Sequence, residues 1–146
     1  KSYEDLKIFR KSAMTSNLNA NLNQSFEINE ISNHLKITLD LLKQEELWNK
    51  NIPKMLCLYF IEMKSFLATL FKKLKKGGTV GIVIGNSSYA GIPILSDVII
   101  CEVAESLNFN VREIIITRNN ETSSQQYKKL NTMVEYVRES VLILKK

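Results

Sequence analysis

Hydrophobic side chains recur at helical spacing through two stretches in the first half of the chain. The first stretch runs from Ile28 to Trp48 and predicts one amphipathic helix over residues 27–48. The second runs from Met55 to Leu74 and has a broad apolar face, with Pro53 at a position that suits a first helical turn. The pattern therefore predicts two long helices in succession, whose methionine and aromatic residues belong to a hydrophobic core.

Short β-branched runs in the second half predict strands. The run from Thr79 to Ile84 is apolar on both faces, which is typical of a strand in a sheet covered on both sides. Further strands are predicted from Val111 to Thr117 and from Ser140 to Leu144, after a helix capped by Ser96. A strand, a helix and a strand in this order predict a parallel crossover unit, and the last two strands could pair antiparallel. Because three strands are too few for a complete doubly wound sheet, we expect one edge of a larger sheet.

The connecting segments are polar. Residues 11–25 are rich in Asn and Ser and predict a loop, either a solvated connector or a segment whose side-chain amides contact adenine. Loops are also predicted for residues 89–95 and 118–137, the second with a short helical turn around 127–130. At Lys75 to Gly78 we expect glycine to supply a left-handed helix cap, with lysines facing the negative end of the helix dipole.

The composition suits one globular domain with its own core. The 146 residues are 45% hydrophobic and contain five Gly, two Pro and two Cys, which excludes a disordered chain and a disulfide scaffold. The net charge of +5 permits attraction to a polyanion such as nucleic acid. The excess is concentrated in one lysine run, at Lys72, Lys73, Lys75 and Lys76.

Cysteine and histidine give no sign of a metal site. Cys57 and Cys101 lie in apolar helical patterns without ligand spacing, so we expect buried thiols in a reducing compartment, and therefore a cytoplasmic protein. His34 is the only histidine, and a surface or satisfied core position is expected for it. Apolar stretches are too short for a membrane span, and the first ten residues do not form a signal peptide.

Four short motifs follow one another in the second half of the chain. Leu74 to Gly78 end a helix, and Gly85-Asn86-Ser87 end the next strand. Ile92-Pro93 and Asp97 then open a helix, and Arg138-Glu139-Ser140 open the last strand. In this order the motifs resemble the C-terminal half of a Rossmann-like (class I) S-adenosylmethionine-dependent DNA amino-methyltransferase, of the N6-adenine or N4-cytosine type. The resemblance covers roughly residues 48–146.

This resemblance implies an α/β fold. The chain would form the C-terminal part of a class I methyltransferase sheet, with a parallel strand-helix-strand unit plus a final antiparallel strand, preceded by two long helices. Residues 1–50 would be a polar entry segment and helical insertion, and residues 51–146 the C-terminal half of the methyltransferase domain.

Two motifs of the family are absent from this sequence. The family binds S-adenosylmethionine mainly through a glycine-rich turn after its first strand, and its catalytic motif ends in Pro-Pro and an aromatic residue. Here the two prolines, Pro53 and Pro93, are isolated, and no glycine-rich turn follows an early strand. By the family's order both motifs lie upstream, so we expect a missing N-terminal half, or a separate complementing chain, to bind the cofactor. The isolated chain is expected to be inactive.

The resemblance also suggests where a pocket lies. Open α/β sheets bind ligands at the carboxyl ends of parallel strands. We therefore expect Asn86 and Ser87 to shape the base or cofactor pocket and Tyr89 to offer a stacking face. In a second interpretation Asn86 makes a turn through its own side chain and Tyr89 covers core surface.

A later loop is also implicated. The resemblance implies that the loop after Arg118 lies near the target base, with Ser123, Ser124 and Gln125 as polar contacts, whereas a solvated hairpin loop is the alternative. Arg118 could contact a phosphate or pair with Glu121 at the surface.

The sequence thus leads to one hypothesis and two alternatives. The chain is expected to be part of a site-specific DNA methyltransferase of a restriction-modification system, which transfers a methyl group to an exocyclic amino group of adenine or cytosine. The first alternative is a non-catalytic basic α/β module that binds nucleic acid with salt-dependent affinity. The second is part of an RNA amino-methyltransferase, since RNA enzymes use the same sheet.

Overall fold

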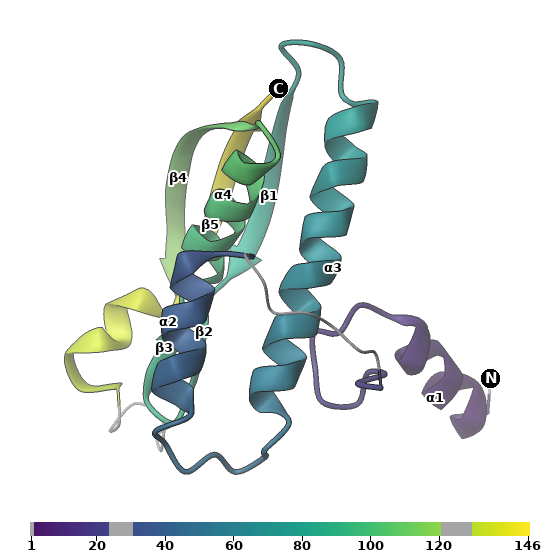
Figure 1. The fold of residues 1–146 in the computed structure, drawn as a ribbon, viewed down its shortest axis with the longest axis vertical. Helices are drawn as coiled ribbons and strands as arrows, with labels where there is room; N and C mark the ends of the chain where they lie inside the picture. Colours follow the sequence, from purple (N-terminus) through teal and green to yellow (C-terminus); the bar gives the residue numbers. More distant parts are fainter. Residues whose placement is uncertain (1, 24–30, 121–129) are drawn as a thin grey trace.

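The computed structural model describes residues 2–23, 31–120 and 130–146 (Figure 1). Its helices α1 to α4 span Tyr3–Ser12, Asn33–Leu42, Ile52–Lys73 and Ser96–Ser106, and a 3-10 helix, η1, spans Asn131–Tyr136. Strands β1 to β5 span Thr79–Gly85, Ser87–Tyr89, Ile92–Ile94, Asn110–Asn119 and Arg138–Lys145. No helix in the described part of the chain is long and apolar enough to cross a bilayer.

The main sheet has three strands in the order β1-β5-β4, and both pairings are antiparallel. The predicted parallel strand-helix-strand unit is therefore wrong, because β5 lies between β1 and β4 and no parallel pairing occurs among the described strands. The predicted antiparallel pairing of the last two strands is confirmed. The apolar run from Val141 to Leu144 explains this order, because such a strand suits a central position where its backbone pairs on both sides.

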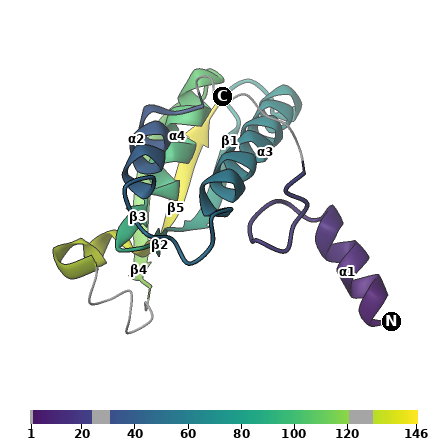
Figure 2. The same cartoon turned by 60° about the horizontal axis from the view of Figure 1, so that its bottom comes forward.

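Helix α4 packs on one face of this sheet, with α2 and α3 beside it, and all three share one hydrophobic core with the sheet (Figure 2). On β5, Ser140, Leu142 and Leu144 face this core and are buried, whereas the intervening residues are half-buried. Fully buried side chains come from all three helices, among them Leu35, Phe60 and Ile99. The core therefore draws on residues from both sides of position 50, and the division into two segments stays a prediction.

The opposite face of the sheet is open to solvent. Val83 is 64% exposed and Ile115 41% exposed, and both lie opposite Val141 in the strand register. Ile143, two residues along β5, is half-buried. We call these four residues, Val83, Ile115, Val141 and Ile143, the open face. The open face is apolar, although no described residue covers it. This is unusual, because the solvent-exposed face of an antiparallel sheet normally carries polar side chains.

The starts of the helices differ in how well they were predicted. Pro53 occupies the first turn of α3, as predicted. The first long helix is shorter than predicted, because α2 begins after the Ser32 cap and ends at Leu42, and residues 27–30 lie outside the described residues. The predicted Ser96 cap is wrong: the N-cap residue of α4 is Leu95, and a carboxylate oxygen of Asp97 accepts the backbone N–H of Val98 instead.

The end of α3 also departs from prediction. The C-cap residue Leu74 is extended, and Gly77 (φ +76°) lies three residues further, in a turn closed by a hydrogen bond from Gly78 N to Lys75 O. The free carbonyl groups of Phe71 and Leu74 accept hydrogen bonds from Nζ of Lys146 at 2.6 and 2.9 Å. A distant lysine therefore caps the helix, and glycine makes the turn into β1.

Several elements were not predicted. The segment expected to be a loop contains the β2–β3 hairpin, whose turn has positive φ at Ala90 and Gly91. Helix α1 begins with a capping box between Ser2 and Asp5 and lies apart from the main body in Figure 1. The turn expected around residues 127–130 lies almost entirely outside the described residues, and η1 follows it.

Candidate functional site

A cavity of about 220 Å³ opens at the carboxyl end of β1, between this strand, the β2–β3 hairpin and α3. Its lining residues are small, apolar or hydroxyl-bearing: Thr15, Ser16, Met55, Leu56, Tyr59, Gly85, Ser87, Tyr89 and Ser96. The position arises because β1 ends at Gly85 and the chain reverses into β2 two residues later. The cavity therefore lies at the edge of the sheet where β1 ends and β5 begins.

Two tyrosines form the aromatic part of this cavity. Tyr59 comes from α3 and packs edge-on against Phe60, with ring centroids 5.0 Å apart. Tyr89 comes from the end of β2. Burial raises the pKa of both phenols, and for Tyr89 a hydrogen bond with Ser87 partly opposes this rise. Both side chains are therefore neutral at physiological pH and offer ring faces and hydroxyl groups to a ligand.

A buried polar network lies directly behind the cavity wall. Asn86 is 4% exposed, and its Nδ2 donates to Asp97 Oδ1 at 2.9 Å and to Tyr136 O at 3.0 Å. Its Oδ1 accepts the backbone N–H of Asp97 at 3.1 Å. Because both ends of the amide are used, Asn86 holds β1 against α4 and η1. The amide is thus engaged within the protein rather than turned toward the cavity.

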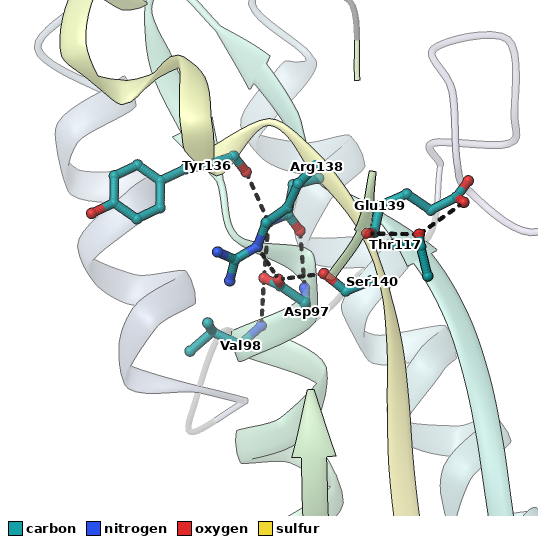
Figure 3. Close-up of polar contacts among 8 residues, drawn as sticks. Asp97, Val98, Thr117, Tyr136, Arg138, Glu139 and Ser140 are labelled. Carbon is teal, nitrogen blue, oxygen red and sulfur yellow. Dashed lines mark hydrogen bonds and ion pairs between the residues drawn. The ribbon is translucent and has the colours of Figure 1, made fainter. Parts of the chain in front are cut away.

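Asp97 is the centre of the network. It has no exposed surface, and its Oδ2 accepts hydrogen bonds from Arg138 Nε and Ser140 Oγ, each at 3.0 Å (Figure 3). Arg138 and Ser140 lie on the same face of β5, two residues apart. The network therefore joins the end of β1, the start of α4 and the start of β5, and it fixes the position from which Ser87 and Tyr89 enter the cavity.

The remaining predicted site residues lie elsewhere. Arg118, near the end of β4, is 69% exposed and pairs with Glu139 at 3.0 Å. Ser123, Ser124 and Gln125 lie outside the described residues, as does Glu121. The structure thus brings Ser87 and Tyr89 into one cavity, has Asn86 behind it, and separates Arg118 from it.

Sequence reasoning missed two parts of the site. One is the network of Asp97, Arg138 and Ser140, although all three belong to the motifs that carried the resemblance. The other is Thr15, which is 1% exposed and donates from its backbone N and its Oγ1 to the two carboxylate oxygens of Glu62, at 2.7 Å each. This contact ties the N-terminal segment to α3 beside the cavity. No local pattern in the sequence reveals it, since the two residues are 47 positions apart.

The described residues contain no cluster of three or more His, Cys, Asp or Glu that could hold a metal ion. Cys57 and Cys101 are buried free thiols. Burial raises the pKa of Cys101 to about 11, and the nearby carboxylates of Asp97 and Glu105 add to this rise. His34 is partly exposed and pairs with Glu102, as expected for a surface histidine with a partner.

The cavity does not fit S-adenosylmethionine as its main binding site. This cofactor carries a sulfonium, an ammonium and a carboxylate group, yet no charged side chain is among the described residues that line the cavity. The two glycines with positive φ, Gly77 and Gly91, belong to a turn before β1 and to the β2–β3 hairpin. Neither forms a glycine-rich turn that would bring backbone amides to a ligand.

Comparison with known proteins gives one relationship. The chain is 36% identical over 85 residues to the type II methyltransferase M.AvaI of Nostoc sp. (strain PCC 7120). The identity is the same for the type II methyltransferase M.AvaI of Anabaena variabilis. The chain is similar to part of a methyltransferase. The matched segment is 58% of this chain and 18% of the relatives, so the chain spans less than a fifth of the proteins it matches. No protein-family model and no solved structure matches it.

Proposed function

We propose that the chain forms one flank of a DNA amino-methyltransferase, which transfers a methyl group from S-adenosylmethionine to an exocyclic amino group of adenine or cytosine. The similarity to M.AvaI supports this assignment. The observation that carries it is the cavity at the carboxyl end of β1, because Ser87 and Tyr89 line it and Asn86 supports it. These are three of the residues for which the resemblance implied a pocket role.

In this proposal the chain forms walls of the pocket that receives the target base. Tyr89 and Tyr59 supply ring faces, which suit the flat surface of a base turned out of the duplex. The hydroxyl of Ser87 supplies a hydrogen-bonding group at the edge of the base. Methyl transfer depends mainly on holding the amine in line with the methyl donor in a dry pocket, so the contribution of this chain is orientation and exclusion of water.

The rest of the enzyme is proposed to complete the sheet. Among the described strands β1 pairs only with β5, so the other edge of β1 has unpaired backbone groups. The open face next to it is apolar, with Val83 as its most exposed residue. We propose that another part of the methyltransferase, within the same polypeptide or in a separate complementing chain, pairs with this edge and covers this face. That part would also carry the glycine-rich turn and the Pro-Pro motif.

Reconstitution tests this proposal. The chain is produced together with the polypeptide that carries the two absent motifs, and incorporation of labelled methyl groups into duplex DNA is measured. We expect incorporation with the complemented protein and none with the isolated chain. Tyr89→Ala should lower incorporation about tenfold, because stacking on a base is worth roughly 1–3 kcal/mol.

Tyr3→Ala is the matched control, since Tyr3 is 69% exposed on α1, apart from the cavity. Equal losses in the two variants would contradict a pocket role for Tyr89. Methylation of RNA but not DNA by the complemented protein would favour the RNA enzyme instead. Failure of every complemented preparation to methylate either nucleic acid would leave the non-catalytic module as the better account.

A further inference from the structure

A second and larger concavity lies on the other side of α3. It is a groove of about 980 Å³ between α2, the first turns of α3 and α4. Pro53, Lys54 and Cys57 line the groove, whereas their neighbours Met55, Leu56 and Tyr59 line the cavity described above. The beginning of α3 therefore separates two concave sites.

The groove is rich in lysine. Lys36 and Lys43 come from α2 and its cap, and Lys50 and Lys54 come from the start of α3 and the connection before it. Lys43 is already paired with Asp40 at 2.8 Å. The other three lysines have no ion pair within the described residues. Lys43 and, to a smaller extent, Lys36 lower the pKa of Asp40, so Lys50 and Lys54 carry most of the unpaired positive charge of the groove among the described residues.

The acidic residues of the groove offset part of this charge. Asp40 is bonded to Lys43, and Glu102 accepts hydrogen bonds from Ser32 and His34. Those contacts hold the pKa of Glu102 below its ordinary value, although burial alone would raise it. Glu105 is the remaining acid in the lining. An anionic ligand would therefore meet a small excess of positive charge, with four lysines against three acidic residues in the lining.

An exposed tryptophan lies next to these lysines. Trp48 belongs to the connection between α2 and α3, two residues before Lys50, and is 71% exposed. It is the only tryptophan in the chain. Exposing a large aromatic side chain to water is unfavourable, and burying it against a ligand is favourable. Surfaces that bind nucleic acid usually combine basic residues with aromatic ones. Glu45 and Glu46 are also exposed on this connection. Because these carboxylates repel phosphates, an approaching DNA strand would be directed toward the lysines.

We propose that this groove binds the DNA substrate beside the target base, with Lys36, Lys50 and Lys54 contacting phosphates and the indole of Trp48 stacking on a base. The proposal rests on the proposed function for its choice of ligand. It adds a binding surface that the cavity does not include, and it assigns DNA contact to a segment that contains none of the family-like motifs. The lysine run at residues 72–76 is at the opposite end of α3, so it belongs to a different surface.

The single tryptophan makes the experiment direct. The full chain is titrated with duplex DNA and with DNA containing unpaired bases, and the fluorescence of Trp48 is followed together with its accessibility to acrylamide. We expect quenching and protection, more strongly with unpaired bases. Anisotropy of labelled DNA should show about tenfold weaker binding for Trp48→Ala, since stacking contributes about 1–3 kcal/mol per base.

Paired lysine variants test the electrostatic part. Lys50→Gln with Lys54→Gln should lower the slope of log affinity against log salt by roughly 1.8, because each phosphate contact contributes about 0.9. The matched control is Lys72→Gln with Lys73→Gln, which removes the same charge from exposed positions at the other end of α3. We expect the control to leave the slope unchanged. Lys50, Lys72 and Lys73 are exposed and Lys54 is half-buried, and circular dichroism of each variant will check that it folds.

Three outcomes would overturn the proposal. One is DNA binding without change in Trp48 fluorescence, a second is equal effects of the two lysine pairs, and a third is quenching by anionic lipid vesicles but not by DNA. The assay is independent of methylation. If the complemented enzyme is active but DNA leaves the fluorescence of Trp48 unchanged, the groove is rejected and the proposed function is kept. If DNA quenches Trp48 but no complemented preparation methylates DNA, the groove is kept and the proposed function is rejected.

Discussion

The two faces of β5 carry two ion pairs that differ in almost every respect. On the face toward the helices, Arg138 pairs with Asp97, and their side chains are 18% and 0% exposed. On the opposite face the next residue, Glu139, pairs with Arg118, which is 69% exposed. Figure 3 shows the first pair inside a network of buried partners and Glu139 turned away from it toward Thr117.

This difference separates the part of the sheet that the chain completes by itself from the part that it does not. On the covered face, Asp97 accepts hydrogen bonds from Arg138 and Ser140, and the apolar neighbours Leu142 and Leu144 are buried. On the open face, apolar residues such as Val83 and Ile115 remain exposed. Polar groups are hydrogen-bonded on both faces, whereas apolar residues are buried on one face and exposed on the other.

The largest effect is expected at the centre of the covered network. Asp97→Ala removes the acceptor of Arg138 and Ser140 and leaves the guanidinium without a partner in a mostly buried position. The free energy of unfolding should fall by about 3–5 kcal/mol, which is the usual cost of removing one partner of a buried pair. Urea unfolding followed by circular dichroism measures it.

Two further variants sharpen the interpretation of that loss. Asp97→Asn keeps the shape of the side chain and should cost less than the alanine variant. Asp97→Leu combined with Arg138→Met should recover part of the stability, because no unpaired charge remains. A loss below about 1 kcal/mol for Asp97→Ala would show that the network contributes little to folding.

The apolar residues of the two faces allow a second comparison. Leu142 has no exposed surface, so Leu142→Ala should destabilise the chain by about 2–5 kcal/mol. Val83 is 64% exposed, and Val83→Thr keeps a β-branched side chain, so it should change stability by less than about 0.5 kcal/mol. Equal losses would mean that the open face is covered in solution, and sedimentation would then test for self-association.

The sequence predicted features that depend on neighbouring residues better than features that depend on contacts between residues far apart in the chain. Helix α3, the two ends of β1 and the buried cysteines follow from local periodicity and composition, and they were predicted within a few residues. The strand order was not predicted, because a sheet with β1 and β4 as neighbours and a sheet with β5 between them use the same local patterns. Only the pairing of β5 with both neighbours distinguishes them.

The site shows the same limit. A resemblance in motif order directed attention to Ser87 and Tyr89, which do line a cavity. The role of Asn86 could not be read from position alone, since its partners Asp97 and Tyr136 are 11 and 50 residues away. The contact of Thr15 with Glu62 had no local signal at all. Short motifs thus indicated which residues matter, whereas the contacts that give them their roles are long-range.

An intermediate effect is expected for Glu102, which is 28% exposed and accepts hydrogen bonds from Ser32 and His34. Its pKa in the folded chain is below the ordinary 4.5, despite a burial effect that raises it. The folded state therefore holds this proton less tightly than the unfolded state, and the stabilisation is present above pH 4.5 and lost as the pH falls through the folded pKa. Glu102→Gln should cost about 1 kcal/mol at pH 7, from weaker hydrogen bonds, and less at pH 3.

Urea unfolding at both pH values measures this difference. Glu105→Gln is the matched control, because Glu105 is an exposed acid on the same helix, three residues away. A cost for Glu102→Gln that stays constant between pH 3 and pH 7 would contradict the assignment, because it would then come from packing and not from the ionised carboxylate.

The smallest effect is expected for the exposed pair on β5. Arg118→Ala should change the free energy of unfolding by about 0–1 kcal/mol, because solvent screens the charges and the long side chain loses entropy when it is held. The change should shrink further at 1 M salt, where screening acts within about 3 Å. A salt-independent loss as large as that of Asp97→Ala would mean that the open face is shielded from solvent, and the contrast between the two faces of β5 would no longer hold.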